Sequence, residues 1–172
     1  MGKSDVTATL LVGLGGLGSG IVNRIYGEVK KNGQDKRVEA VVIDTDIGSL
    51  NKNTNIDPIY RIQTSENSTV KGLLERDPSC KEWFPEHPVI LNSQILEGAG
   101  MVRAISRLAL KTAIKANRLS VLNQIGDNLF EVGNETTTRG IRVMIITSLM
   151  GGTGSGIFLQ VPLLLRDILE NK

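Results

Sequence analysis

Four short runs of mainly apolar residues divide the chain into strand-like segments. Residues 7–12 (TATLLV), 38–43 (VEAVVI) and 141–147 (IRVMIIT) are nearly continuous in apolar side chains, and residues 59–62 (IYRI) form a weaker run. Strands that are apolar on both faces are typical of a parallel sheet with helices on both sides. We therefore expect these residues to form buried parallel strands.

Apolar residues spaced by three and four predict the helices between them. Ile21, Val22 and Ile25 fall on one helical face, and the Asn32-Gly33 pair is a stop signal. The same period over residues 102–129 predicts one long amphipathic helix or two helices in series. Its basic residues Lys111, Lys115 and Arg118 are interpreted as a solvated surface.

The remaining segments have weaker signals. Residues 63–98 have mixed charge and three prolines, which indicate loops and short helices. Residues 133–140 are expected to be a loop. The apolar stretch 157–171 predicts a helix in which Pro162 causes a kink or a late start, because proline lacks the N–H donor.

The order of these elements predicts the fold class. The sequence strand, glycine-rich turn, helix occurs after residue 12 and again after residue 147. We expect an α/β fold with a doubly wound, Rossmann-like parallel sheet of strand order 3-2-1-4. Residues 1–172 are expected to form a single domain.

Composition narrows the function classes. With one cysteine and one histidine in 172 residues, the chain has neither a disulfide framework nor a histidine-rich or zinc-ribbon metal site. A net charge of +2 and 3% aromatic residues give no indication of nucleic-acid binding. Because the chain has neither a secretory signal nor an apolar run of about 18 residues, we expect a cytoplasmic protein with no membrane partner.

Glycine is concentrated in two clusters, residues 13–20 and 151–156. A glycine run that follows a strand and opens a helix presents backbone N–H groups to an anion, most often phosphate. Two such loops would lie at the same edge of one parallel sheet. Together they predict a polyphosphate ligand, whereas the alternative is that these glycines only form tight turns.

Each polar residue in the second glycine cluster or at the end of the second strand has two possible roles. The hydroxyls of Thr153 and Ser155 could bond phosphate oxygens or cap a helix. Asp44 and Asp46, at the end of the second strand, could hold a ribose hydroxyl or a magnesium-bound water. They could equally be loop or capping residues.

The first glycine loop by itself fits two enzyme families. Gly13, Gly15 and Gly18 match the dinucleotide-binding fingerprint of NAD(P) enzymes, although Asp44 lies farther beyond Gly18 than the roughly 20 residues of that pattern. GLGGLG with a later Asp-Thr-Asp also resembles ATP-dependent adenylating enzymes. Residues 49–53 (SLNKN) differ from the corresponding stretch of that family, and Cys80 has no partner for its zinc motifs.

The second glycine loop indicates a third family. Residues 151–156 (GGTGSG) resemble the signature loop of the tubulin and FtsZ superfamily of GTPases. Residues 12–25 (VGLGGLGSGIVNRI), 40–50 (AVVIDTDIGSL) and 98–100 (GAG) then resemble its first three nucleotide loops, in the same order. The resemblance spans the chain, with an insertion between Tyr60 and Glu97, and is closest to a divergent bacterial or phage member.

The resemblance implies a role for each matching residue. The first loop would bind the α- and β-phosphates, the second would lie near the phosphates and Mg²⁺, the third would sense the γ-phosphate, and the fourth would wrap the phosphate tail. In that order the residues are Gly15, Gly16, Leu17, Gly18 and Gly20; Asp44, Thr45 and Asp46, with Asp46 a candidate metal ligand through water; Ala99, Gly100, Met101 and Arg103; and Gly151, Gly152, Thr153, Gly154 and Ser155.

The same resemblance sets the expected ligands and the open alternatives. It implies GTP or GDP with Mg²⁺, head-to-tail self-association into filaments, and hydrolysis groups and a base-reading segment that lie beyond the position matching Lys172. The chain would then be the N-terminal part of a longer protein. Gly20 and Asp44 stand where the division proteins usually have asparagine, so a scaffold with a vestigial site is a further alternative, beside the NAD(P)- or ATP-dependent enzyme.

Overall fold

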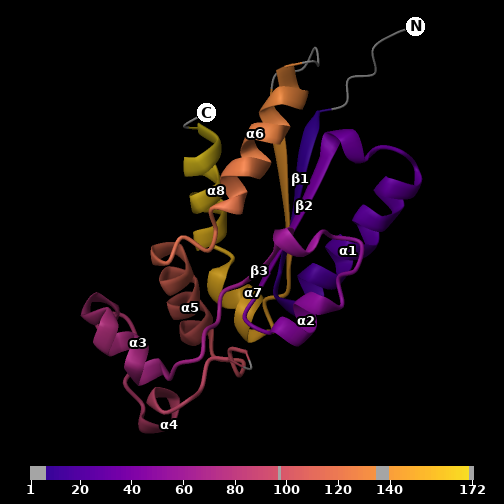
Figure 1. Ribbon diagram of the computed structural model, residues 1–172. Helices are drawn as coiled ribbons and strands as arrows, with labels where there is room; N and C mark the ends of the chain where they lie inside the picture. The colour runs from indigo at the N-terminus through magenta and orange to yellow at the C-terminus, as the bar shows by residue number, and fades with distance from the viewer. Residues whose placement is uncertain (1–6, 97, 135–139, 171–172) are drawn as a thin grey trace, which may run out of the picture.

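The computed structural model describes residues 7–96, 98–134 and 140–170 (Figure 1). Its sheet is entirely parallel, in the order β3-β2-β1-β4, which confirms the predicted α/β class and strand order. The strands are β1 (Ala8–Leu14), β2 (Val38–Asp44), β3 (Arg61–Gln63) and β4 (Ile141–Thr147).

The boundaries of β1, β2 and β3 differ from the prediction by one or two residues, whereas those of β4 agree with it. β1 does not end before Gly13 but continues to Leu14, so the glycine cluster begins inside the strand. β3 begins only at Arg61, because Pro58–Tyr60 form a 3-10 turn that Asp57 caps by accepting the Ile59 N–H. Proline favours such a turn start, since its missing N–H is not needed there.

Eight α-helices lie in the described residues: α1 (Gly15–Lys31), α2 (Ile47–Asn51), α3 (Val70–Arg76), α4 (Pro88–Leu91), α5 (Arg103–Lys115), α6 (Val121–Asn134), α7 (Gly152–Ile157) and α8 (Gln160–Glu170). Short 3-10 turns lie at Asp35–Arg37, Pro58–Tyr60 and Pro78–Cys80. The pattern over 102–129 therefore forms two helices in series. None of these helices has both the length and the apolar character needed to cross a membrane.

Helices cover both faces of the sheet (Figure 1). Leu10, Val12 and Leu14 of β1 pack with the face that carries α6, α8 and the end of α5. Leu11 points to the opposite face, which is covered by α1 and α2. This alternation along a strand with two buried faces gives the three-layer architecture.

Of the three residues predicted to share one apolar face of α1, only Val22 is buried. Ile21 and Ile25 are exposed, at 39% and 42%, whereas Val22 and Tyr26 are buried. The helix already begins at Gly15, within the glycine cluster, and its buried residues Gly18, Val22 and Tyr26 recur every four positions. Close packing of Gly18 against β4 sets this rotation, since its Cβ position is filled by the Ile146 carbonyl.

The stretch after residue 151 forms two helices rather than one. α7 ends at Ile157, and α8 begins at Gln160, so that Pro162 lies in the first turn of α8. The first N–H groups of a helix have no intrahelical acceptor, so a proline there loses nothing. A late helix start is therefore confirmed. α6 extends to Asn134, past the predicted start of a loop, and residues 135–139 of that loop lie outside the described residues.

The insertion segment, residues 64–96, consists of loops and short helices, as predicted, and has its own small core. Val70, Leu73, Leu74, Cys80, Phe84 and Ile95 pack on Ile105, Leu108 and Ala109 of α5. In Figure 1 this segment, with α3 and α4, lies beside α5 and away from the sheet. The insertion segment is therefore an appendage of α5.

The basic residues of α5 and its C-terminal turn are not a free solvated surface. Lys111 and Lys115 form ion pairs with Asp77 of the insertion segment, at 3.4 and 2.5 Å. Lys115 and the Ser79 hydroxyl hold the pKa of Asp77 well below its ordinary value. Arg118 bonds the Ser65 carbonyl oxygen at 2.7 Å. These cations fasten the insertion segment to α5.

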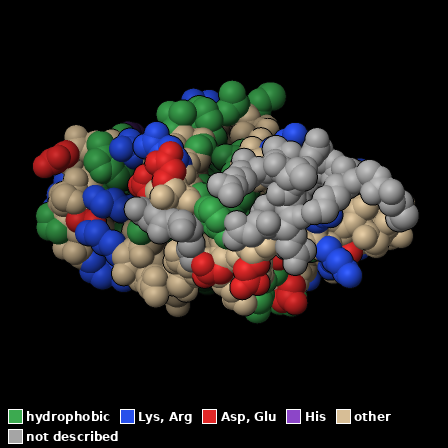
Figure 2. All heavy atoms as spheres, turned by 90° about the horizontal axis from the view of Figure 1, so that it is seen from above, with side chains coloured by type: hydrophobic (Ala, Val, Ile, Leu, Met, Phe, Trp, Pro, Cys, Tyr) green, Lys and Arg blue, Asp and Glu red, His purple; other side chains and the backbone are tan. Residues whose placement is uncertain are grey.

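The end of the molecule at which the strands begin has a mixed surface. Figure 2, which looks down on this end, shows Lys and Arg among Asp and Glu in the atoms that it colours. The carboxyl ends of the strands lie at the opposite end, where the glycine loops meet.

Candidate phosphate-binding site

The two glycine loops meet at the carboxyl ends of β1 and β4. They enclose a hollow of about 170 Å³, lined by Leu14, Gly15, Gly16, Leu17, Ser148, Gly151, Gly152, Thr153 and Gly154. The register that pairs Leu14 with Thr147 places the two loops at the same level of the sheet. Residues more than 130 positions apart thus share one concave surface.

Glycine is required where the loops approach each other. Gly15 has a φ of +69°, in the left-handed region, and a Cβ there would lie 3.0 Å from the Gly154 nitrogen. A Cβ on Gly154 would overlap the Thr147 hydroxyl and lie 2.9 Å from the Leu14 carbonyl oxygen. Side chains at these two positions would separate the loops and destroy the hollow.

Two helices begin in this region without a side-chain cap. α1 begins at Gly15, and the N-cap residue before it, Leu14, provides no side-chain cap. Gly151 likewise provides none for α7. The first N–H groups of a helix lack intrahelical partners, and the helix dipole makes this end attractive to anions. The hollow therefore suits a phosphate group.

Other residues predicted for the first loop lie elsewhere. Gly18 is buried inside α1 against the Ile146 carbonyl, where it allows close helix–sheet packing. Gly20 does not line the hollow, and nothing lies within 4 Å of where its Cβ would be. Leu17 lines the hollow and is 58% exposed.

The second loop is joined to the fourth by a buried hydrogen bond. The hydroxyl oxygens of Thr45 and Thr153 are 2.7 Å apart. The Ser65 hydroxyl donates to the Thr45 carbonyl oxygen at 2.5 Å, which adds the start of the insertion segment to the same cluster. Thr45 therefore connects three segments, whereas the sequence indicated only that it lies near the phosphates.

Asp44 is a buried carboxylate, with 2% of its surface exposed. Its Oδ1 accepts the backbone N–H of Thr45 at 2.7 Å and that of Asp46 at 3.4 Å. Burial raises the pKa of Asp44, against the opposing hydrogen bonds from Asp46, Thr153, Thr45 and Ser49. The side chain thus holds the backbone of the second loop through these two hydrogen bonds.

Asp46 is half-buried and caps α2, since its Oδ1 accepts the Gly48 N–H at 2.8 Å. The described residues contain no group of three or more His, Cys, Asp or Glu side chains that could hold a metal. Magnesium at a nucleotide needs only one or two protein ligands besides phosphate and water. A single carboxylate at this position fits that mode and not an all-protein metal site.

The third loop lies against the fourth. Gly100 and Met101 both have positive φ, 51° and 61°, and the Cα of Met101 lies 2.7 Å from where a Cβ of Gly152 would be. Arg103 Nη2 donates to the Leu149 carbonyl oxygen at 3.2 Å. Met101 is exposed, whereas Ala99 is buried in the core of the insertion segment.

Ser155 does not line the hollow. Its hydroxyl donates to the Gly151 carbonyl oxygen, one turn earlier in α7. The Thr153 hydroxyl lies beside that of Thr45. Ser148, which was not among the predicted site residues, lines the hollow. Its position directly after β4 is the signal that could have identified it.

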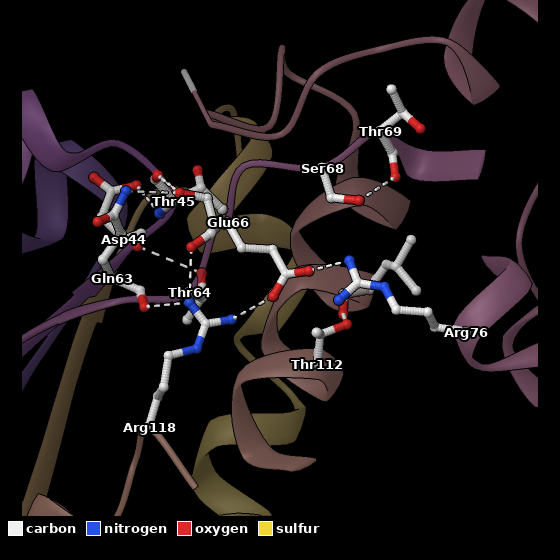
Figure 3. A network of polar contacts seen from close by, with 12 residues as sticks. Asp44, Thr45, Gln63, Thr64, Glu66, Ser68, Thr69, Arg76, Thr112 and Arg118 are labelled. Carbon is white, nitrogen blue, oxygen red and sulfur yellow. Dashed lines mark hydrogen bonds and ion pairs between the residues drawn. The ribbon is translucent and has the colours of Figure 1, made fainter. Parts of the chain in front are cut away.

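A polar network extends from the second loop into the insertion segment (Figure 3). Arg118 donates to the carbonyl oxygens of Ser65 and Gln63, at 2.7 and 3.4 Å, and lies 3.5 Å from Glu66 Oε2. Glu66 also pairs with Arg76 of α3. No sequence pattern indicated that Arg118 serves this region, because the contact spans more than 50 positions.

Comparison with known proteins supports the same grouping of motifs. The family model described as tubulin-like matches residues 10–172, which include all four loops. Searches of curated proteins and of solved structures give no match. With the strand order and the paired glycine loops, the match confirms the resemblance seen in the sequence. The chain therefore belongs to the tubulin-like family.

Proposed function

We propose that the chain binds the phosphates of GTP or GDP, with Mg²⁺, in the hollow between the first and fourth loops. The observation that carries this proposal is the meeting of two glycine loops, with uncapped helix starts, around one hollow. The tubulin-like family supports a nucleotide as the anion.

The residues have different roles in this proposal. The backbone of Gly15, Gly16 and Gly151 to Gly154 contacts phosphate oxygens, with the Ser148 hydroxyl beside them. The Thr45–Thr153 bond fixes the distance between the second and fourth loops. Asp46 holds a water on Mg²⁺. Gly100 and Met101, beside Gly152, respond to a γ-phosphate.

The alternatives predict different ligands. An NAD(P)- or ATP-dependent enzyme would use the first loop, with no role for Gly151 to Gly156. Calorimetric titration of GTP, GDP, ATP and NAD in the presence of Mg²⁺ distinguishes them. Preference for a guanine nucleotide, or equal binding of GTP and ATP through the phosphates, supports the proposal. Binding of NAD or ATP without binding of GTP would overturn it.

A methyl group at Gly151 is expected to weaken nucleotide binding. Nothing lies within 4 Å of the Cβ position at Gly151, so Gly151→Ala keeps the fold and adds bulk at the edge of the hollow. We expect about a tenfold weaker Kd for GDP, because backbone must approach the phosphate closely. The readouts are calorimetry for Kd and circular dichroism for folding.

The control for this variant is Lys36→Ala, at an exposed site near the start of β2, the opposite end of the sheet. Its Kd should stay within about twofold of the original. If Gly151→Ala binds GDP as tightly as the control, the fourth loop does not contact the phosphates.

Hydrolysis requires chemical groups that the hollow lacks. None of its lining residues has an ionisable side chain, so the groups that orient water on the γ-phosphate come from outside it. We propose that a second copy, associated head to tail, supplies them. Exposed apolar side chains at and beside the hollow support this contact, because a second copy would cover them. They are Leu17, Met101, Leu149 and Met150.

A further inference from the structure

A second concave surface lies between the insertion segment, α5 and the start of α8. It consists of two hollows, of about 340 and 260 Å³, that share Trp83, Arg107 and Gln160. The first is also lined by Arg103, Phe158 and Leu159, and the second by Lys111 and Ile114. We call this surface the α5 groove. No residue lines both it and the phosphate hollow.

The α5 groove is positively charged. Arg103, Arg107 and Lys111 follow each other at four-residue spacing along α5, one per turn. The Arg107 guanidinium lies 4.3 Å from the centre of the Trp83 ring. Lys111 is paired with Asp77, but within the described ranges no carboxylate forms an ion pair with Arg103 or Arg107. Neither arginine charge is therefore neutralised by a carboxylate of the described residues, and Arg103 is held in place by its hydrogen bond to the Leu149 carbonyl oxygen.

Apolar and hydrogen-bonding groups line the same groove. Leu159 is 61% exposed, Ile114 is 41% exposed, and the Trp83 ring is shared by both hollows. Gln160 Oε1 is buried and, among the residues that the structure describes, has no hydrogen-bond donor. A buried acceptor without a donor is costly. Because Gln160 lines both hollows, rotation of its side chain into the groove would let a ligand N–H satisfy this oxygen.

The dimensions match a short extended peptide. From Arg103 to Ile114 the helix rises about 16 Å, at 1.5 Å per residue. About five residues of extended chain cover that length. Such a chain presents alternate side chains to opposite sides, and its backbone supplies N–H donors.

We propose that the α5 groove binds a short acidic segment of a partner protein, in which acidic and large apolar residues alternate. The acidic side chains pair with Arg103 and Arg107, the apolar ones contact Trp83 and Leu159, and a backbone N–H donates to Gln160. Arginine and tryptophan are the residue types that most often dominate such interfaces.

The test uses a fluorescein-labelled peptide, Glu-Leu-Glu-Phe-Glu, with the whole chain and without nucleotide. Binding is followed by fluorescence anisotropy, and by the emission of Trp83, the sole tryptophan of the chain. We expect saturable binding that Arg107→Glu weakens by about tenfold or more, because charge reversal replaces attraction by repulsion. Arg24→Glu, an exposed reversal on α1, is the matched control and should change Kd by less than about twofold.

A second variant tests the proposal independently if Arg107→Glu does not fold. Leu159→Glu places a negative charge at an exposed position and should weaken binding similarly, with unchanged circular dichroism. The proposal is overturned if the peptide does not bind, if Lys-Leu-Lys-Phe-Lys binds equally well, or if both groove variants bind like Arg24→Glu. Equal competition by free glutarate would identify a simple anion site and would also overturn it.

Discussion

Asp44 shows how a single side chain organises the second loop without being exposed. Its carboxylate receives two backbone N–H groups and lies close to the Thr153 and Ser49 hydroxyls. Burial of a charge is nevertheless unfavourable, and it raises the pKa of this group. Asparagine, the residue usual in the bacterial division proteins, keeps an acceptor oxygen and carries no charge.

Asp44→Asn is therefore expected to gain stability relative to the wild type as the pH rises. The native pKa is above the unfolded one, so the native state holds the proton more tightly. The ionised form costs stability, and this cost is absent below the ordinary pKa of 3.8, grows up to the raised native pKa and is complete above it. Melting temperatures of both proteins between about pH 4 and about pH 7 measure the change.

Two other outcomes of this measurement would contradict a net cost of burying the Asp44 carboxylate. A difference in melting temperature that stays constant over that range would mean that burial and the hydrogen bonds to the Asp44 carboxylate cancel, so that its pKa is the same in the folded and unfolded states. A difference that grows in favour of the wild type with rising pH would mean that the hydrogen bonds outweigh burial.

The insertion segment is the element that joins α5 to the second loop. The segment is attached to α5 by its own apolar core and by ion pairs of Asp77 with Lys111 and Lys115. It is attached to the second loop by Ser65 and Arg118. The position of the second loop therefore depends on the position of the insertion segment through these hydrogen bonds.

Arg118→Met is expected to destabilise the fold by about 1–3 kcal/mol, because it leaves the Ser65 and Gln63 carbonyls and Glu66 without this donor. Urea unfolding gives the free energy. Lys36→Met, an exposed cation in the short 3-10 turn before β2, should change it by less than about 0.5 kcal/mol. Equal effects of the two variants would show that the Arg118 contacts contribute nothing.

For the whole molecule, the exposed apolar residues at one end are the main indication of an assembly. Met150 is 87% exposed and Met101 77%, and both belong to the loops around the candidate site. Large side chains of this kind are unfavourable in water and mark interaction sites when they lie together. A second copy seated on this end would also cover the hollow.

Met150→Glu is expected to reduce GTP-dependent self-association by about tenfold or more, since the contact would have to bury a charge. Sedimentation velocity with GTP and with GDP measures it. Val89→Glu, at a 73% exposed apolar residue of α4, is the matched control and should sediment like the original. Loss of association in both variants would point to a general charge effect.

The sequence by itself determined the sheet, its strand order and the family. Strands buried on both faces leave continuous apolar runs, and positions that need close backbone approach or positive φ leave glycines, as at Gly15 and Gly154. These are local requirements, so they are visible in one segment at a time. The order of the four loops added the family, which the family model then matched.

Only the tertiary structure decided which face of α1 is buried, where Asp44 points and what Arg118 contacts. Ile21 and Ile25 have the period of a buried face, but the packing of Gly18 on β4 rotates them outward. The Thr45–Thr153 bond and the contacts of Arg118 join residues far apart in the chain. Such contacts depend on how elements pack against each other, and that packing is not a property of any single segment.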